Sequence, residues 1–280
     1  MHPIRLTESP RDAQQGLPYV IPAEKRAEYI NALLKVGFDV IDFGSFVSPK
    51  AIPQMAEQQK VLELVDKSGS ETQLMAIVGN ERGGEEAARQ EKVDILGFPY
   101  STSTTFLQKN INANDEKAIE IIGILIDICQ REGKSLRIFM SLAFGNPYGD
   151  RHDKELLAQK INLLIEKGIH SITLADTIGQ SSADTLAETM NYIIHQFPGL
   201  NPGLHLHTRP NEWYGKIDAA YKAGCRSFDG VLNGIGGCPM SGYELVGNLN
   251  TLNLINYFEH QNIPHRLAYD KLIEAARIPY

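Results

Sequence analysis

Two histidines separated by one residue, His205 and His207, form the pair in this chain best suited to act together chemically. Residues i and i+2 of a strand point to the same face, so both imidazoles would face one point. Two imidazoles joined by a carboxylate and an amide oxygen suit a divalent ion such as Mn²⁺, Mg²⁺ or Zn²⁺. Two hydrogen-bonded histidines in a folded core are the other interpretation, and the motif alone leaves both open.

A second group of candidates, Arg11, Asp12 and Gln15, follows Pro10 near the start of the chain. If residues 4–9 form a strand, Pro10 should end it because proline cannot donate to a strand ladder. Arg11 and Asp12 would then project from the following loop. An arginine beside an aspartate is either an ordinary ion pair or a metal ligand next to an anion-binding guanidinium.

A glycine-rich stretch at residues 234–242 contains Cys238. It has neither the lysine of a Walker A loop nor the spacing of a dinucleotide-binding motif. The stretch is therefore either a plain turn with a buried cysteine or a flexible lid whose thiol acts as an acid or base. Cys129 and Cys225 fall on helical core patterns and are expected only to pack, as reduced thiols.

The elements that must position these residues follow a repeating order of strand and amphipathic helix. Glycines that would cap helices in the left-handed conformation stand at Gly37, Gly133, Gly168 and Gly224. Strands are predicted at 4–9, 40–46, 72–78, 93–100, 136–144, 171–176, 203–208 and 227–232. Helices are predicted at 23–36, 56–68, 84–91, 115–132, 153–167, 183–197, 212–223 and 243–260.

This alternation predicts an α/β protein with the (β/α)8 TIM-barrel fold, a single catalytic domain over 1–280 and a glycine-rich lid after strand eight. A doubly wound sheet would usually show a glycine-rich turn where Pro10 stands. Catalytic groups of a barrel belong at the C-terminal ends of its strands. The candidates at those positions are Arg11, Asp12, Asp42, Ser45, Thr173, Asp176, His205 and His207.

Composition narrows the classes of partner. The chain has 280 residues, of which 42% are hydrophobic, enough for a large core. A net charge of -7 with dispersed lysines and arginines argues against nucleic acid as a partner. Without a long apolar run or a leader-like N-terminus, the chain is expected to be a cytoplasmic protein with no membrane partner.

Several motifs together resemble hydroxymethylglutaryl-CoA lyase. In order along the chain they are Pro10-Arg11-Asp12 with Gln15, Ser45-Phe46-Val47-Ser48-Pro49-Lys50, Asp176-Thr177-Ile178-Gly179, His205 with His207, Gly236-Gly237-Cys238-Pro239 and Gly247-Asn248-Leu249. They run from residue 10 to residue 249, so the resemblance covers nearly the whole chain. The Arg-Asp start and the histidine pair are shared with isopropylmalate and homocitrate synthases.

The resemblance implies cleavage of 3-hydroxy-3-methylglutaryl-CoA to acetyl-CoA and acetoacetate, with an acyl-CoA as partner and a divalent ion as cofactor. Mg²⁺ or Mn²⁺ is implied, with Zn²⁺ as an ion that could replace them in crystals. The implied metal ligands are Asp12, His205, His207 and Asn248. The implied catalytic residues are Arg11, Cys238 and, as alternative acceptors of the hydroxyl proton, His205 and Asp42. The expected substrate contacts are Arg11, Gln15, Ser45, Thr173 and Asp176.

The chain departs from the family's pattern where Asp42 replaces a glutamate and Thr208 replaces an aspartate. Two other functions stay open. A Claisen-type synthase of the same superfamily would usually carry a further C-terminal region, whereas this sequence ends at Tyr280. A catalytically silent barrel is the second alternative. The number of subunits is also open, with a homodimer as one option.

Overall fold

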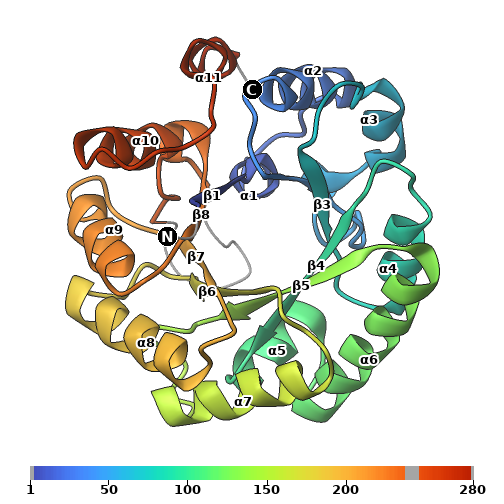
Figure 1. Ribbon diagram of the computed structural model, residues 1–280. Coiled ribbons are helices and arrows are strands. Elements are labelled where there is room, and N and C mark those ends of the chain that lie inside the picture. Colours follow the sequence, from blue (N-terminus) through green and yellow to red (C-terminus); the bar gives the residue numbers. More distant parts are fainter. Residues whose placement is uncertain (1–2, 237–245, 279–280) are drawn as a thin grey trace.

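The computed structural model describes residues 3–236 and 246–278 and shows a closed barrel of parallel strands with helices around it (Figure 1). The strands follow sequence order, from β1 to β8, and β8 pairs with β1. Their bounds are β1 Arg5–Glu8, β2 Val40–Ser45, β3 Gln73–Ile77, β4 Ile95–Ser101, β5 Ser135–Ser141, β6 Ile172–Asp176, β7 Gly203–Leu206 and β8 Ser227–Gly230. The predicted TIM-barrel fold is confirmed.

Most of the helices lie outside the ring of strands, whereas α1 lies beside β1 nearer the centre of the view (Figure 1). Their bounds are α1 Pro10–Gln15, α2 Ala23–Leu34, α3 Gln58–Leu64, α4 Glu81–Ala88, α5 Thr104–Ile111, α6 Asp115–Glu132, α7 Lys154–Glu166, α8 Ala183–Gln196, α9 Trp213–Lys222, α10 Thr251–His260 and α11 Tyr269–Ala276. Short 3₁₀ turns, η1 Pro53–Met55 and η2 Leu232–Gly234, complete the regular structure of the described residues. Among these residues, no helix is both long and apolar enough to cross a membrane.

The core has two layers because the barrel strands bury both of their faces. Ile41, Leu74 and Ile138 belong to the large cluster that packs the strands against the helices. Val40 and Met75, their alternating neighbours, belong to a small separate cluster with Ile95 and Phe139. Successive side chains of a strand point to opposite faces, so this second cluster fills the interior of the barrel.

The predicted elements need four corrections. Residues 10–15 form α1 rather than a loop, because proline suits the first turn of a helix, where its missing N–H costs nothing. Helices α5 and α11, each of eight residues, were not predicted. Helix α10 begins at Thr251 instead of residue 243, with the side chain of Asn250 accepting a hydrogen bond from the Leu252 N–H.

Candidate metal and acyl-CoA site

Helix α1 places three of the candidate side chains directly after β1. Its six residues are all buried, and its first residue is Pro10. Asp12 and Gln15 lie three positions apart and so meet on one face of the helix. The Gln15 Nε2 donates a hydrogen bond to Asp12 Oδ1 at 2.8 Å. The helix therefore aims the Asp12 carboxylate and holds it in place, which the predicted loop would not have done.

The Arg11 guanidinium is fixed by two carboxylates. Its Nε and Nη2 donate to Asp42 Oδ2 at 3.1 and 2.5 Å, and its Nη1 donates to Asp12 Oδ1 at 3.0 Å. Asp42 comes from β2, where the register with β3 shifts between Asp42 and Gly44. A bulge of this kind redirects a side chain beside a functional site. Asp42 thus orients Arg11 from β2.

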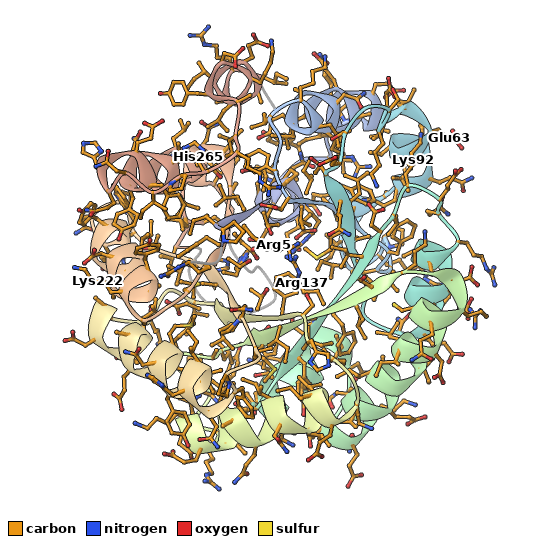
Figure 2. The ribbon with its side chains drawn as sticks, viewed as in Figure 1. Arg5, Glu63, Lys92, Arg137, Lys222 and His265 are labelled. Atoms are coloured by element: carbon orange, nitrogen blue, oxygen red, sulfur yellow. The ribbon has the colours of Figure 1, made fainter. Side chains whose placement is uncertain are left out.

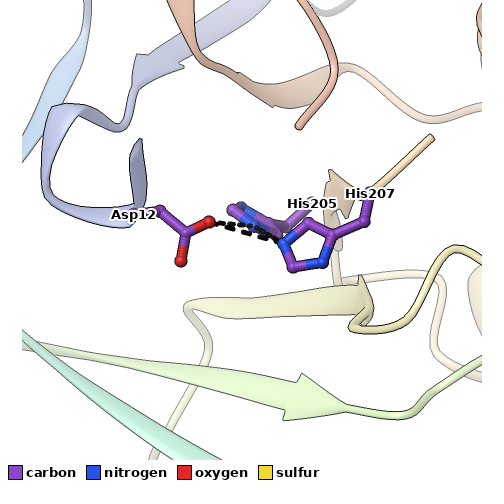
Figure 3. A group of neighbouring side chains, drawn as sticks. All are labelled: Asp12, His205 and His207. Carbon is purple, nitrogen blue, oxygen red and sulfur yellow. Dashed lines mark hydrogen bonds and ion pairs between the residues drawn. The ribbon is translucent and has the colours of Figure 1, made fainter. Parts of the chain in front are cut away.

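Both histidines project from the end of β7 toward Asp12 (Figure 3). The Nε2 atoms of His205 and His207 are 3.3 Å apart. They lie 3.9 and 3.4 Å from Asp12 Oδ2. All three side chains are buried, and one ligand atom from each lies within 4.8 Å of the others. The predicted convergence of the two imidazoles is confirmed.

Asn248 contacts both Asp12 and His207. It forms an isolated backbone bridge with His207, and its side-chain Nδ2 donates to Asp12 Oδ2 at 2.8 Å and to the Ile235 carbonyl at 3.0 Å. Gly236 lies against the same group with φ of +103°, and a Cβ there would stand 2.7 Å from the Asp12 carbonyl oxygen. Only glycine fits both the backbone angle and this close approach.

Burial and charge set the protonation of the group. Burial alone would raise the pKa of Asp12, but the Arg11 guanidinium, a hydrogen bond from His207 and both imidazoles hold that pKa well below its usual range. Burial lowers the pKa of His205, yet the Asp229 hydrogen bond and the Asp12 charge outweigh it, so the pKa is raised. Burial raises the pKa of Asp42, with Arg11 opposing. The cluster thus keeps an ionised carboxylate at its centre.

The donor set fits a divalent ion. One carboxylate and two imidazoles, buried and converging within 4.8 Å, match the mixed oxygen and nitrogen ligands of such sites. Arg11 already pairs with Asp12 Oδ1, whereas Asp12 Oδ2 faces the Nε2 atoms of both imidazoles. Asp12, His205 and His207 are the residues that could hold the ion, with Asn248 beside them.

A cavity of about 160 Å³ opens at the C-terminal ends of the strands and includes this cluster in its wall. Its polar side is formed by Arg11, Asp12, Gln15, Ser45, His205 and His207. Its apolar side is formed by Ile52, Ile77, Val78, Phe106, Ile111 and Phe139. The Ser45 Oγ is buried and has no hydrogen-bond partner in the described part of the chain, so it is available to a ligand.

Two of the predicted substrate contacts, Thr173 and Asp176, do not line this cavity. Thr173 is the second residue of β6, not its end, and it lines a separate cavity together with Arg137. Asp176 ends β6, but its carboxylate accepts hydrogen bonds from the backbone N–H groups of Gln180 and Ser181 and so holds the following loop. Cys238 lies outside the described residues, and so does most of the predicted lid.

The structure also adds residues that sequence reasoning missed. Ser141 and Thr177 line the cavity from the ends of β5 and β6, and Asn110 lines it from α5. Asp229 on β8 contacts His205, with Nδ1 and Oδ2 3.3 Å apart. An ionisable residue in the middle of a buried strand was the available signal for Asp229, whereas Asn110 had none because α5 was not predicted.

Comparisons with known proteins agree with this site. The family model described as HMGL-like matches residues 4–278. A hydroxymethylglutaryl-CoA lyase of Bacillus subtilis is 30% identical over 268 residues, covering 96% of this chain and 89% of the relative. An (R)-citramalyl-CoA lyase of Chloroflexus aurantiacus is also 30% identical, covering 96% of this chain and 87% of the relative.

Solved structures are similar over the same length. The crystal structure of the Bacillus subtilis HMG-CoA lyase superposes with a TM-score of 0.91 at 28% identity, covering 98% of this chain and 92% of that one. An HMG-CoA lyase from Acinetobacter baumannii, solved with coenzyme A and 3-methylmalate, gives a TM-score of 0.89 at 28% identity, covering 98% and 89%. The chain therefore belongs to the HMGL-like family, and it is a carbon–carbon lyase.

Proposed function

We propose that this protein cleaves 3-hydroxy-3-methylglutaryl-CoA to acetyl-CoA and acetoacetate with the help of a divalent ion, Mg²⁺ or Mn²⁺. The observation that carries the proposal is the convergence of Asp12, His205 and His207 beside Arg11 in the wall of one cavity. The relative solved with coenzyme A and 3-methylmalate supports an acyl-CoA substrate. The substrate contacts in this proposal are Arg11, Gln15 and Ser45.

The reaction breaks a carbon–carbon bond next to a tertiary alcohol, so negative charge develops on the alcohol oxygen and on the departing thioester enolate. A divalent ion, when bound, would supply Lewis-acid stabilisation and a fixed geometry for oxygen atoms. Arg11 is the residue suited to donate a hydrogen bond to the thioester oxygen, because two carboxylates already hold its guanidinium in place. A donor fixed before the reaction stabilises developing charge without reorganisation.

Proton transfer involves the remaining candidates. Asp42 does not line the cavity, and both of its oxygens accept hydrogen bonds from Arg11. We therefore assign Asp42 to holding Arg11 rather than to accepting the hydroxyl proton. His205 is assigned to the metal set, because its Nε2 is one of the converging ligand atoms. Cys238 is proposed on its sequence motif as the donor that returns a proton to the enolate carbon.

The test is an assay of purified protein with Mn²⁺ or Mg²⁺, following acetoacetate and acetyl-CoA release from 3-hydroxy-3-methylglutaryl-CoA. Citramalyl-CoA is run in parallel, because a citramalyl-CoA lyase is as similar to this chain as the Bacillus subtilis enzyme. The expected result is metal-dependent cleavage of the methylglutaryl substrate. Preferential cleavage of citramalyl-CoA would replace the substrate in this proposal, and equal rates in excess EDTA would refute the metal requirement.

A variant tests the ligand set separately. His207→Ala removes one imidazole without entering the hydrophobic clusters of the core, so the fold should survive. Mn²⁺ titration by calorimetry should show a large loss of affinity. Unchanged affinity and stoichiometry in this variant would contradict the assignment of His207 as a ligand.

A further inference from the structure

Asp229 lies behind His205, on the side of the imidazole away from the other ligand atoms. Its Oδ2 is 3.3 Å from His205 Nδ1, whereas His205 Nε2 is 3.3 Å from His207 Nε2. Asp229 is 2% exposed and does not line the cavity at the barrel mouth. It can therefore act on a bound substrate or ion only through His205.

We propose that Asp229 is a positioning residue that holds His205 in the tautomer with hydrogen on Nδ1. The carboxylate accepts the Nδ1 hydrogen, and the lone pair of Nε2 is thereby left facing Asp12 and His207. A carboxylate behind a ligand histidine fixes the ring orientation and the tautomer in this way. The proposal rests on the proposed metal-dependent function, because the free Nε2 matters only if an ion binds there.

Arg137 supports Asp229 from the opposite side. Its Nη1 lies 4.0 Å from Asp229 Oδ1 and donates to Thr7 Oγ1 at 3.2 Å. Arg137 is buried within the ring of strands (Figure 2). Asp229 Oδ1 has no hydrogen-bond partner among the described residues, so Arg137 is the cation that offsets the buried charge of Asp229. Asp229 thus lies between Arg137 and His205, with one carboxylate oxygen near each.

This arrangement makes the Asp229→Asn variant informative. Arg137 can only donate hydrogen bonds, so the amide oxygen of the new side chain should turn toward it. The amide NH₂ would then face His205 Nδ1, which must accept, and the ring hydrogen would move to Nε2. An Nε2 that carries hydrogen cannot bind a metal. Replacing a carboxylate by an amide behind a functional histidine produces the wrong tautomer in serine proteases for this reason.

The experiment compares wild type, Asp229→Asn and Asp94→Asn. Asp94 is a matched control, because its carboxylate accepts the Leu74 N–H on the barrel wall and has no contact with the histidines. Two readouts are used. Mn²⁺ affinity is measured by calorimetry, and the His205 tautomer of the metal-free protein is read from ¹⁵N NMR at a pH where imidazole is neutral. A His205→Gln sample assigns the signal.

The expected result is a ~10–100-fold loss of Mn²⁺ affinity in Asp229→Asn, as for other residues behind metal ligands, with Asp94→Asn unchanged. The wild-type His205 should carry its hydrogen on Nδ1, and in Asp229→Asn it should move to Nε2. Wild-type hydrogen on Nε2, or unchanged affinity in Asp229→Asn, would overturn the proposal. The NMR readout needs neither ion nor substrate, so a protein that failed the lyase assay but showed this tautomer change would refute only the proposed function.

Discussion

Replacing Glu8 with glutamine should remove a large part of the pH dependence of folding stability between about pH 5 and pH 8. Glu8 ends β1 and is fully buried. Its Oε1 accepts the Leu232 N–H at 2.6 Å, and its Oε2 accepts the Thr251 hydroxyl at 2.5 Å. No ion pair to Glu8 is found among the described residues, so burial raises its pKa from 4.5 to about 8 despite both hydrogen bonds.

The sign and size follow from linkage between proton binding and folding. The folded protein holds the Glu8 proton more tightly than the unfolded chain, so this stabilisation is fully present below pH 4.5 and is lost as the pH rises to about 8. The slope across this window is about 1.4 kcal/mol per pH unit, and the loss between pH 5 and pH 8 is roughly 3–4 kcal/mol. Glutamine keeps the shape and has no proton to lose.

The assay is urea unfolding followed by circular dichroism at pH 5, 6, 7 and 8, in EDTA so that metal binding adds no pH dependence of its own. The free energy of unfolding of Glu8→Gln minus that of wild type should increase steadily with pH. Glu63→Gln, an exposed site on the outside of the barrel in Figure 2, is the control and should run parallel to wild type. A Glu8→Gln difference that stays constant from pH 5 to pH 8 would refute the reasoning.

Three further predictions concern the site. Arg11→Gln should lower kcat by ~10²–10³-fold, as loss of a fixed donor to developing charge does, while Mn²⁺ affinity measured by calorimetry changes little; a change in KM alone would make Arg11 a simple binding contact. Gly236→Ala should lower both kcat and kcat/KM, because the new Cβ would stand 2.7 Å from the Asp12 carbonyl oxygen. Steady-state kinetics equal to wild type would contradict this close approach. Iodoacetamide at neutral pH should inactivate the enzyme through Cys238, since burial raises the pKa of Cys129 to about 11 and that of Cys225 to about 12. Mass spectrometry identifies the modified thiol, and a Cys238→Ser protein as active as wild type would remove Cys238 from the mechanism.

Local patterns in the sequence were sufficient for the fold. Buried strands and amphipathic helices alternate, and Gly133 closes α6 in the left-handed conformation that its position after the helix predicts. The spacing of His205 and His207 also determined that both imidazoles face one point, because side chains two apart on a strand share a face. These features depend only on near neighbours, and they were therefore readable without the structure.

The tertiary structure decided which distant residues meet and which stay apart. Asp229 lies 24 positions from His205, and no local signal joined the two until β7 and β8 paired. Asp42 was a candidate proton acceptor by sequence, yet the packing of α1 on β2 commits its oxygens to Arg11. Thr173 and Asp176 share a strand with an end at the barrel mouth, but one faces a different cavity and the other holds a loop. Such outcomes depend on barrel closure, strand register and a bulge in β2, which arise from contacts between segments far apart in the chain.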